Sequence, residues 1–207
     1  MIEYIVPNNI DDRVLAKTAQ ILEGGGIAAV PTDTSWSLVC SMKSREGIKK
    51  LRNLSGKREE ELFTLLCSDI SQFGEFCHFD NTRFRLIKRL TPGPYVFILK
   101  TLLGTEKTLG LRRSEIGVRL PDYSVPLSVV DFLKCPLYSV TAKKDLDEFY
   151  EYEEDSLFEG GWELESISGV DVILDPGEDR SRIFSTVLDM REGEVELLRQ
   201  GAGAWPV

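Results

Sequence analysis

The residues best suited to chemistry are hydroxyls and cations that follow predicted strands. Residues 31–34 read Pro-Thr-Asp-Thr after an apolar stretch, so Thr32 and Thr34 fall in a tight turn at a strand end. Arg119 is the sole charge in the apolar segment 116–121. In open α/β sheets, ligands bind outside strand ends. The remaining members of the set are Lys57, Arg58, Thr141, Lys143, Ser185, Thr186 and Arg199.

This combination of side chains is typical of a site for a small anionic substrate. Arginine and lysine on a converging rim bind phosphate or carboxylate through charge-assisted hydrogen bonds. Such a site suits phosphoryl or nucleotidyl transfer, in which positioning and charge neutralisation dominate. A purely structural interpretation exists for each residue, because a turn threonine often bonds its own backbone and strand-end cations are often solvated. The joint pattern is what favours a site.

Other kinds of active site have weaker support. The single histidine, His78, lies beside a cysteine and two phenylalanines, so we expect it to be packed or exposed rather than catalytic. No His-Glu-x-x-His or other metal-ligand spacing occurs, and we predict no metal site. The glycines at residues 24–26 lack the GxxxxGK[ST] pattern of a phosphate loop, which favours a helix-ending turn. Catalysis by paired carboxylates stays open, because none of the 34 acidic residues stands out.

Composition and charge narrow the class of protein. A chain of 207 residues is long enough to bury a core, and we predict one domain over residues 1–207. The sequence has no apolar run long enough for a membrane span and no signal peptide, so we expect a cytoplasmic protein. Its four cysteines form no CxxC pair and are expected to be reduced. The net charge of −9 argues against binding of polyanions through bulk charge.

Strand-like and helix-like segments alternate, which predicts an α/β fold with a twisted mixed sheet, flanking helices and a concave cleft. The last two strands follow each other without a helix and should pair antiparallel. The acidic run 145–165 predicts a solvated helix, with a mobile lid as the alternative. Strands are predicted at residues 2–6, 27–30, 36–40, 62–67, 95–100, 116–120, 137–141, 170–174, 184–189 and 195–199. Helices are predicted at residues 12–22, 44–54, 69–76, 81–90 and 124–133.

These segments, in this order, resemble the YrdC/YciO family of threonylcarbamoyl-AMP synthase-like proteins. Each segment alone is weakly specific, and their joint order carries the resemblance. Tyr95 and the strand at residues 63–67 are most similar to the YciO-like branch. The resemblance implies a YrdC-like fold with a large basic cleft. The matching segments are residues 25–34, 91–100, 116–121, 185–189 and 198–202.

The resemblance also implies an activity. Active members of the family join L-threonine, bicarbonate and ATP into threonylcarbamoyl-AMP and pyrophosphate, with ATP as substrate and Mg²⁺ accompanying it. The product serves the formation of threonylcarbamoyladenosine in tRNA. By position, threonine binding would fall on Thr34, Arg119, Ser139 and Ser185, the third of these through its backbone. Nucleotide binding would fall on Lys57, Thr141 and Arg199, and catalytic roles on Lys57, Arg58, Thr141 and Lys143.

The phosphate half of the implied site departs from the family pattern. The KxR motif reads Ser-Gly-Lys at residues 55–57, and the SxN motif reads Thr-Ala-Lys at residues 141–143. Arg52 ends a KxR spelling that lies too early in the chain, and Glu61 and Glu115 fall where uncharged ATP contacts are usual. Two alternatives therefore stay open. One is a non-catalytic factor that binds double-stranded RNA or tRNA in the same cleft, and the other is a divergent relative that uses another small carboxylate or nucleotide.

Overall fold

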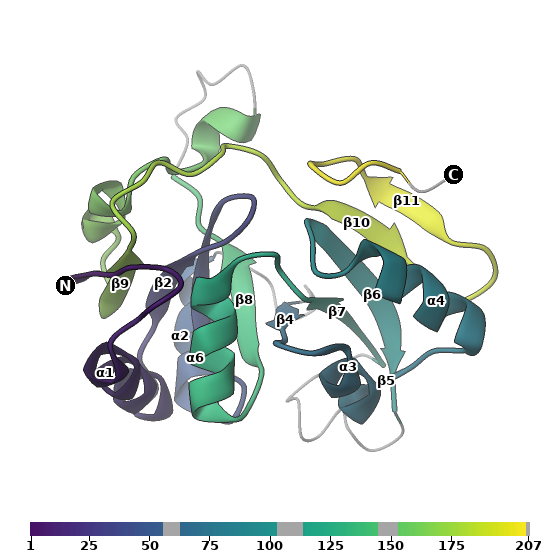
Figure 1. The fold of residues 1–207 in the computed structure, drawn as a ribbon, viewed down its shortest axis with the longest axis horizontal. Coiled ribbons are helices and arrows are strands. Elements are labelled where there is room, and N and C mark those ends of the chain that lie inside the picture. The colour runs from purple at the N-terminus through teal and green to yellow at the C-terminus, as the bar shows by residue number, and fades with distance from the viewer. Residues whose placement is uncertain (56–62, 103–113, 145–152, 206–207) are drawn as a thin grey trace.

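The strands form one mixed sheet, as predicted (Figure 1). The computed structural model describes residues 1–55, 63–102, 114–144 and 153–205. Parallel and antiparallel neighbours occur together, because β1, β9 and β2 pair parallel whereas β2, β3 and β8 pair antiparallel. The order of strands is β1 (Ile2–Tyr4), β9 (Val172–Asp175), β2 (Ala28–Pro31), β3 (Trp36–Ser41), β8 (Leu137–Thr141), β4 (Thr64–Leu66), β7 (Glu115–Arg119), β6 (Tyr95–Thr101), β10 (Thr186–Asp189) and β11 (Glu196–Arg199), with β5 (Cys77–His78) beside β6.

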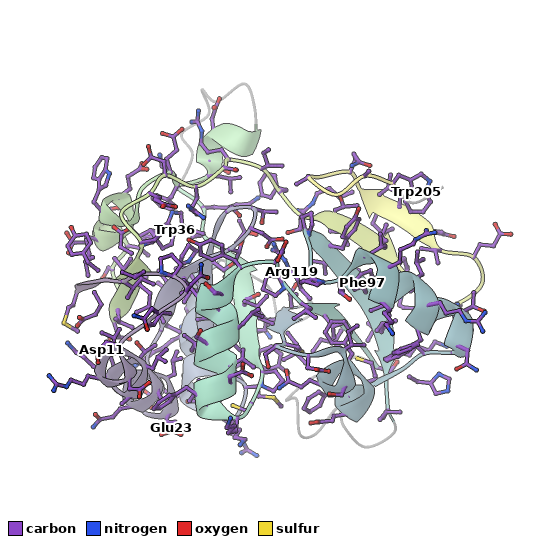
Figure 2. All side chains as sticks on the ribbon, viewed as in Figure 1. Asp11, Glu23, Trp36, Phe97, Arg119 and Trp205 are labelled. Atoms are coloured by element: carbon purple, nitrogen blue, oxygen red, sulfur yellow. The ribbon has the colours of Figure 1, made fainter. Side chains whose placement is uncertain are left out.

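Helices gather in two groups along this sheet (Figure 1). Three of them, α1 (Asp12–Glu23), α2 (Arg45–Leu54) and α6 (Ser124–Leu133), lie beside the part formed by β2, β3 and β8. The other two, α3 (Ile70–Phe76) and α4 (Asn81–Leu90), lie beside β5 and β6. Four of these five helices start at a side-chain cap, in which a polar side chain accepts from a backbone N–H of the first turn, as Asp11 does for α1 (Figure 2). The caps are Asp11, Ser44, Asp69 and Asp80. The cap position of α6, Tyr123, makes no such side-chain bond.

The predicted turn after the first helix is confirmed. The N–H of Gly24 donates to the carbonyls at the end of α1, and Gly25 has a φ of +85°. That dihedral lies in the left-handed region, which glycine adopts without a steric penalty. The turn sends the chain directly into the fully buried strand β2, at whose end the 31–34 turn begins.

The acidic segment corrects the sequence prediction. Its residues 145–152 lie outside the described part of the chain, and the rest forms two 3₁₀ helices, η1 (Glu153–Ser156) and η2 (Gly161–Ser166), rather than a solvated helix. Leu157, Phe158 and Leu164 are buried. The indole N–H of Trp36 donates to the carbonyl of Glu159 over 2.9 Å. Tertiary contacts therefore override the charge pattern, and this segment packs against the end of the sheet.

Three further features bear on function. His78 lies exposed on β5 and does not line the cavity described below. The final strands β10 and β11 pair antiparallel, as predicted. In the described part of the chain, no helix is both long enough and apolar enough to cross a membrane.

All four cysteines are buried free thiols, and we predict that they are chemically inert in the folded protein. Burial raises the pKa of Cys40 and of Cys77 to about 12, and it also raises the pKa of Cys67. Because the thiolate is the reactive species, iodoacetamide at pH 8 should add nothing to the native protein. Mass spectrometry checks this, with the unfolded chain in guanidinium as the control that takes up four adducts. Alkylation of the native protein at the rate of a free thiol would contradict the prediction.

Candidate functional site

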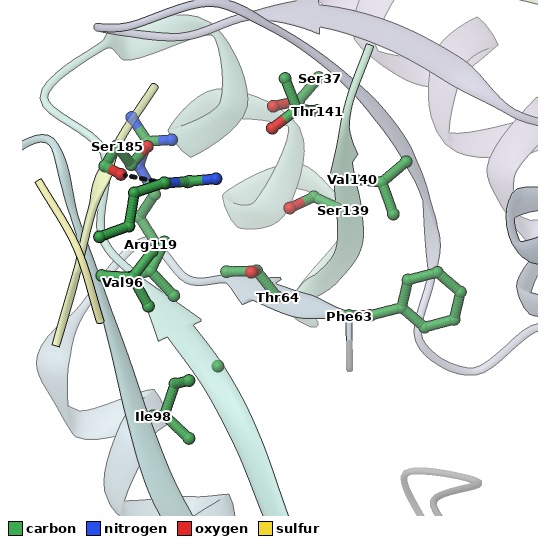
Figure 3. A pocket seen from close by; sticks show the side chains of 13 residues that line it. Ser37, Phe63, Thr64, Val96, Ile98, Arg119, Ser139, Val140, Thr141 and Ser185 are labelled. Carbon is green, nitrogen blue, oxygen red and sulfur yellow. Dashed lines mark hydrogen bonds between the residues drawn. The ribbon is translucent and has the colours of Figure 1, made fainter. Parts of the chain in front are cut away.

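A cavity of about 240 Å³ opens on one face of the sheet (Figure 3). Seven strands or their flanking residues line it, from β3 and β8 on one side to β10 and β11 on the other. Most of its lining consists of hydroxyls, small apolar side chains and two arginines. The lining residues are Ser37, Phe63, Thr64, Val96, Ile98, Gly117, Arg119, Ser139, Val140, Thr141, Ser185, Val187 and Arg199.

Strand alternation explains why these residues share a face. Successive side chains of a strand point to opposite faces of the sheet, so Val96 and Ile98 line the cavity while Phe97 packs in the core beside Phe73 of α3. Strand pairing then carries the same face across the sheet. Ile98 pairs with Gly117, Gly117 with Thr64 and Thr64 with Ser139. This row, Ile98–Gly117–Thr64–Ser139, forms the floor of the cavity.

The glycine in this row keeps the floor open. A Cβ at Gly117 would lie 3.1 Å from Cγ1 of Val96 and 3.2 Å from Oγ1 of Thr64. Any larger side chain there would extend from the floor into the cavity. A glycine inside a strand often marks a close approach of a ligand or of another chain segment.

Arg119 forms a buried ion pair at one end of the cavity. Its Nη2 atom donates to Oδ1 of Asp33 over 2.5 Å and to Oγ1 of Thr34 over 3.1 Å. Only 6% of the Arg119 side chain and 12% of the Asp33 side chain are exposed. Burial lowers the pKa of Arg119 and the carboxylate of Asp33 raises it, but a guanidinium stays protonated in proteins. The site therefore holds a fixed positive charge in a poorly hydrated place.

The ion pair uses only part of its hydrogen-bonding capacity. Nε of Arg119 and Oδ2 of Asp33 are buried, and neither has a hydrogen-bond partner among the described residues. An arginine and a carboxylate commonly form two parallel bonds, whereas this pair forms one. Arg119 therefore keeps donor capacity for an anion entering the cavity.

A chain of hydroxyls connects the 31–34 turn to the opposite side of the site. Oγ1 of Thr32 lies 3.2 Å from Oγ1 of Thr34, which lies 3.4 Å from Oγ of Ser185. Thr32 also donates to the carbonyl of Ser35 over 2.7 Å, which is the structural role that turn threonines often have. Thr34 contacts Arg119 and Ser185 but is not among the residues that line the cavity. It holds two lining residues in place from behind.

Two of the predicted cations meet beside the cavity. Nε of Arg199 donates to the carbonyl of Ser185 over 3.1 Å. The Arg199 guanidinium and the Lys143 ammonium each lie 4.8 Å from the ring centroid of Phe184. Thr141, two residues before Lys143, lines the cavity with Ser139. The structure thus brings together Arg119, Ser139, Thr141, Lys143, Ser185 and Arg199, with Thr34 behind them.

The remaining residues named in the sequence analysis either lie outside the described part of the chain or do not line the cavity. Lys57, Arg58 and Glu61 lie outside the described residues. Glu115 does not line the cavity, because its carboxylate pairs with Nη1 of Arg191 over 2.6 Å. Arg52 stacks at 4.6 Å on the ring of Phe63, and that ring packs against Tyr138 rather than facing the cavity, so the early KxR spelling does not place a cation in the site.

Sequence reasoning did not single out Thr64, Gly117 or Phe184, and it named Asp33 only as part of its turn. Thr64 is a polar residue and Gly117 a glycine inside otherwise apolar strands, and these features were the signals that could have found them. The roles of Asp33 and Phe184 depend on contacts with residues far along the chain, for which no local signal exists.

The described residues gather no group of three or more His, Cys, Asp or Glu side chains that could hold a metal ion. The site in this part of the chain therefore offers anion-binding donors rather than a cage of carboxylates.

Comparison with known proteins identifies the family. A family model described as telomere recombination, which groups Sua5, YciO and YrdC, matches residues 20–201. The chain belongs to the Sua5/YciO/YrdC family. An uncharacterized protein of Haemophilus influenzae is 30% identical, with 97% of this chain and 95% of that protein aligned. YciO of Escherichia coli K12 is 29% identical over the same shares.

More distant members of the family include named enzymes. The threonylcarbamoyl-AMP synthase of Bos taurus is 25% identical, and the alignment covers 87% of this chain and 65% of the bovine protein. The crystal structure of E. coli YciO superposes with a TM-score of 0.85 at 27% identity, over 99% of this chain and 97% of that one. Pyrococcus abyssi Sua5 in complex with L-threonine superposes with a TM-score of 0.81 at 21% identity, over 97% of this chain and 57% of that one. This last likeness is one of fold.

We predict that the Arg119–Asp33 pair is needed for stability as well as for the site. Asp33→Asn leaves a buried guanidinium without its counter-charge, which should lower the free energy of unfolding by about 3 kcal/mol. The matched control is Asp155→Asn, which removes a half-exposed partner of Arg182 at 3.6 Å and should cost less than about 1 kcal/mol. Denaturant unfolding measures both, and equal losses in the two variants would contradict the prediction.

Proposed function

We propose that this protein is a threonylcarbamoyl-AMP synthase-like nucleotidyltransferase, which joins L-threonine, bicarbonate and ATP into threonylcarbamoyl-AMP and pyrophosphate. The observation that carries the proposal is the buried Arg119 with unused donor capacity at one end of a hydroxyl-lined cavity. Two further observations support it. The chain shares its family with threonylcarbamoyl-AMP synthases, and two further cations, Lys143 and Arg199, meet beside the cavity.

In this proposal, the amino acid binds at the Arg119 end. The carboxylate of threonine accepts from the Arg119 guanidinium, while Ser185 and Ser139 offer hydroxyl or backbone groups to the polar substrate. A buried arginine favours this role, because a charge-assisted hydrogen bond is stronger where water is excluded. Thr34 and Asp33 fix the orientation of Arg119 from behind.

The nucleotide binds along the part of the cavity rim where Lys143 and Arg199 meet. Lys143 and Arg199 face its phosphates, and Thr141 offers a hydroxyl. Lys57 and Arg58 are proposed as further phosphate contacts from outside the described residues. Mg²⁺ arrives with ATP and is held through the phosphate oxygens, since the described residues gather no carboxylate cage.

The proposed reaction needs no covalent intermediate with the protein. The amine of threonine and bicarbonate form a carbamate with release of water, and a carbamate oxygen attacks the α-phosphorus of ATP. The bond to the β-phosphate oxygen breaks, and pyrophosphate leaves with the electron pair. The protein supplies orientation and positive charge, the two contributions that dominate phosphoryl-group transfer. The product would then serve threonylcarbamoyladenosine formation in tRNA.

The net charge of −9 weighs against the alternative of a non-catalytic RNA-binding protein.

The direct test is threonine-dependent release of pyrophosphate. The protein is incubated with ATP, Mg²⁺ and bicarbonate, with and without L-threonine, and pyrophosphate and threonylcarbamoyl-AMP are measured. Arg119→Lys should lower kcat/KM for threonine at least about tenfold, because lysine lacks the planar donor fork. Arg191→Lys is the matched control, since Arg191 pairs with Asp189 and Glu115 away from the cavity. If the wild-type protein releases no pyrophosphate and does not bind ATP in calorimetry, the proposal fails.

A second prediction concerns the floor of the cavity. Gly117→Val should weaken threonine binding at least about tenfold, because the new side chain fills space between Val96 and Thr64. Valine suits a strand, so the fold should survive, which the thermal midpoint reports. Gly74→Val is the control, because a Cβ at Gly74 meets nothing within 4 Å. Unchanged threonine affinity in a folded Gly117→Val protein would place the substrate elsewhere.

A further inference from the structure

Phe184 lies where the two sides of the site approach each other. It directly precedes Ser185, which lines the cavity, and only 5% of Phe184 is exposed. Its ring is in contact range of two cationic groups, the Lys143 ammonium and the Arg199 guanidinium, each 4.8 Å from the ring centroid. Cations at such distances are attracted by the electron-rich face of an aromatic ring.

The two cations come from different parts of the sheet. Lys143 follows β8, whereas Arg199 ends β11, and four strands separate these two in the sheet order. Phe184 precedes β10 and so reaches Lys143 from the other side of the cavity. The ring of Phe184 therefore contacts one cation from each of these two parts of the sheet.

This arrangement matches one class of anion. Because both cations lie 4.8 Å from one centroid, they cannot be farther apart than twice that distance. A diphosphate carries its charge on two neighbouring phosphate groups and can engage both cations together. A single carboxylate or monophosphate has less reach. Arginine offers a planar fork and lysine a point charge, a combination common at phosphates.

We propose that Phe184 is a positioning residue that assembles Lys143 and Arg199 into one binding point for the diphosphate portion of a nucleotide. The inference rests on the proposed function and deepens it, because it selects nucleoside triphosphates or diphosphates over monophosphates. Phe184 acts through the two cations and does not itself touch the reacting atoms. Its ring, rather than its volume alone, is what the role requires.

The chain offers a matched control for the ring. Phe158 is also buried and lies 5.3 Å from the Lys144 ammonium, but Lys144 pairs with Glu163 over 2.6 Å and does not line the cavity. Replacing Phe158 by leucine therefore removes a cation–aromatic contact of the same kind without touching the proposed anion site.

The test measures binding of inorganic pyrophosphate by calorimetry to the full-length protein and four variants. Phe184→Leu keeps most of the apolar volume and should weaken pyrophosphate binding about fivefold to twentyfold, as expected for loss of two cation–aromatic contacts. Phe184→Tyr keeps the ring, and Phe158→Leu leaves the site intact, so both should stay within about twofold of the wild type. Lys143→Met should weaken pyrophosphate binding as much as Phe184→Leu does. Threonine affinity should be unchanged in every variant, which separates this role from a general loss of structure.

Either of two results with the variants, or one with the wild type, would overturn the inference. One is wild-type affinity for pyrophosphate in Phe184→Leu, which leaves the proposed function standing if threonine-dependent synthesis persists. The other is an equal loss in Phe184→Leu and Phe158→Leu, which would show a structural effect common to both. A wild-type protein that binds no pyrophosphate also overturns it, and the synthesis assay then decides the proposed function separately.

Discussion

The site depends on one buried ion pair, that between Arg119 and Asp33. It joins the end of β7 to the turn between β2 and β3, and two strands, β8 and β4, separate β7 from that hairpin in the sheet. Burying two charges costs several kcal/mol for each ion, and the cost is recovered only with close geometry and further hydrogen bonds. Thr34 supplies such a bond and passes the connection on to Ser185 before β10. The pair therefore fixes both the shape of the cavity and the position of its positive charge.

The sheet supports this ion pair because successive side chains of each strand point to opposite faces. One face of β6 and β7 buries Phe97, Ile116 and Val118, which supplies the apolar burial that stabilises the fold. The other face carries the small and polar floor row, Ile98–Gly117–Thr64–Ser139. A polar face on an otherwise apolar sheet requires either solvent or a ligand as its partner. The core and the cavity are thus two consequences of the same period-two pattern.

Local rules account for what the sequence could predict. The helix starts at Asp11, Ser44 and Asp80 follow from capping by their own side chains, and the strands follow from apolar runs. Contacts between distant segments were beyond such rules. The acidic segment forms 3₁₀ turns because it packs on Trp36, more than 100 residues earlier. The floor row pairs residues from four strands. The proposed role of Phe184 depends on its contacts with Lys143 and Arg199, which are distant in the sequence.

Arg119 and Lys143 are held by different physical means, and this bears on where the chain departs from the pattern that the resemblance implies. The Arg119 end is buried and cross-linked by hydrogen bonds, so a change there would leave a charge or a polar group without a partner. Lys143, by contrast, is exposed and contacts the face of an aromatic ring, an interaction with loose geometric demands. Substitution of asparagine by lysine is tolerable at such a place. The core therefore constrains the buried Arg119 pair more tightly than it constrains the exposed Lys143.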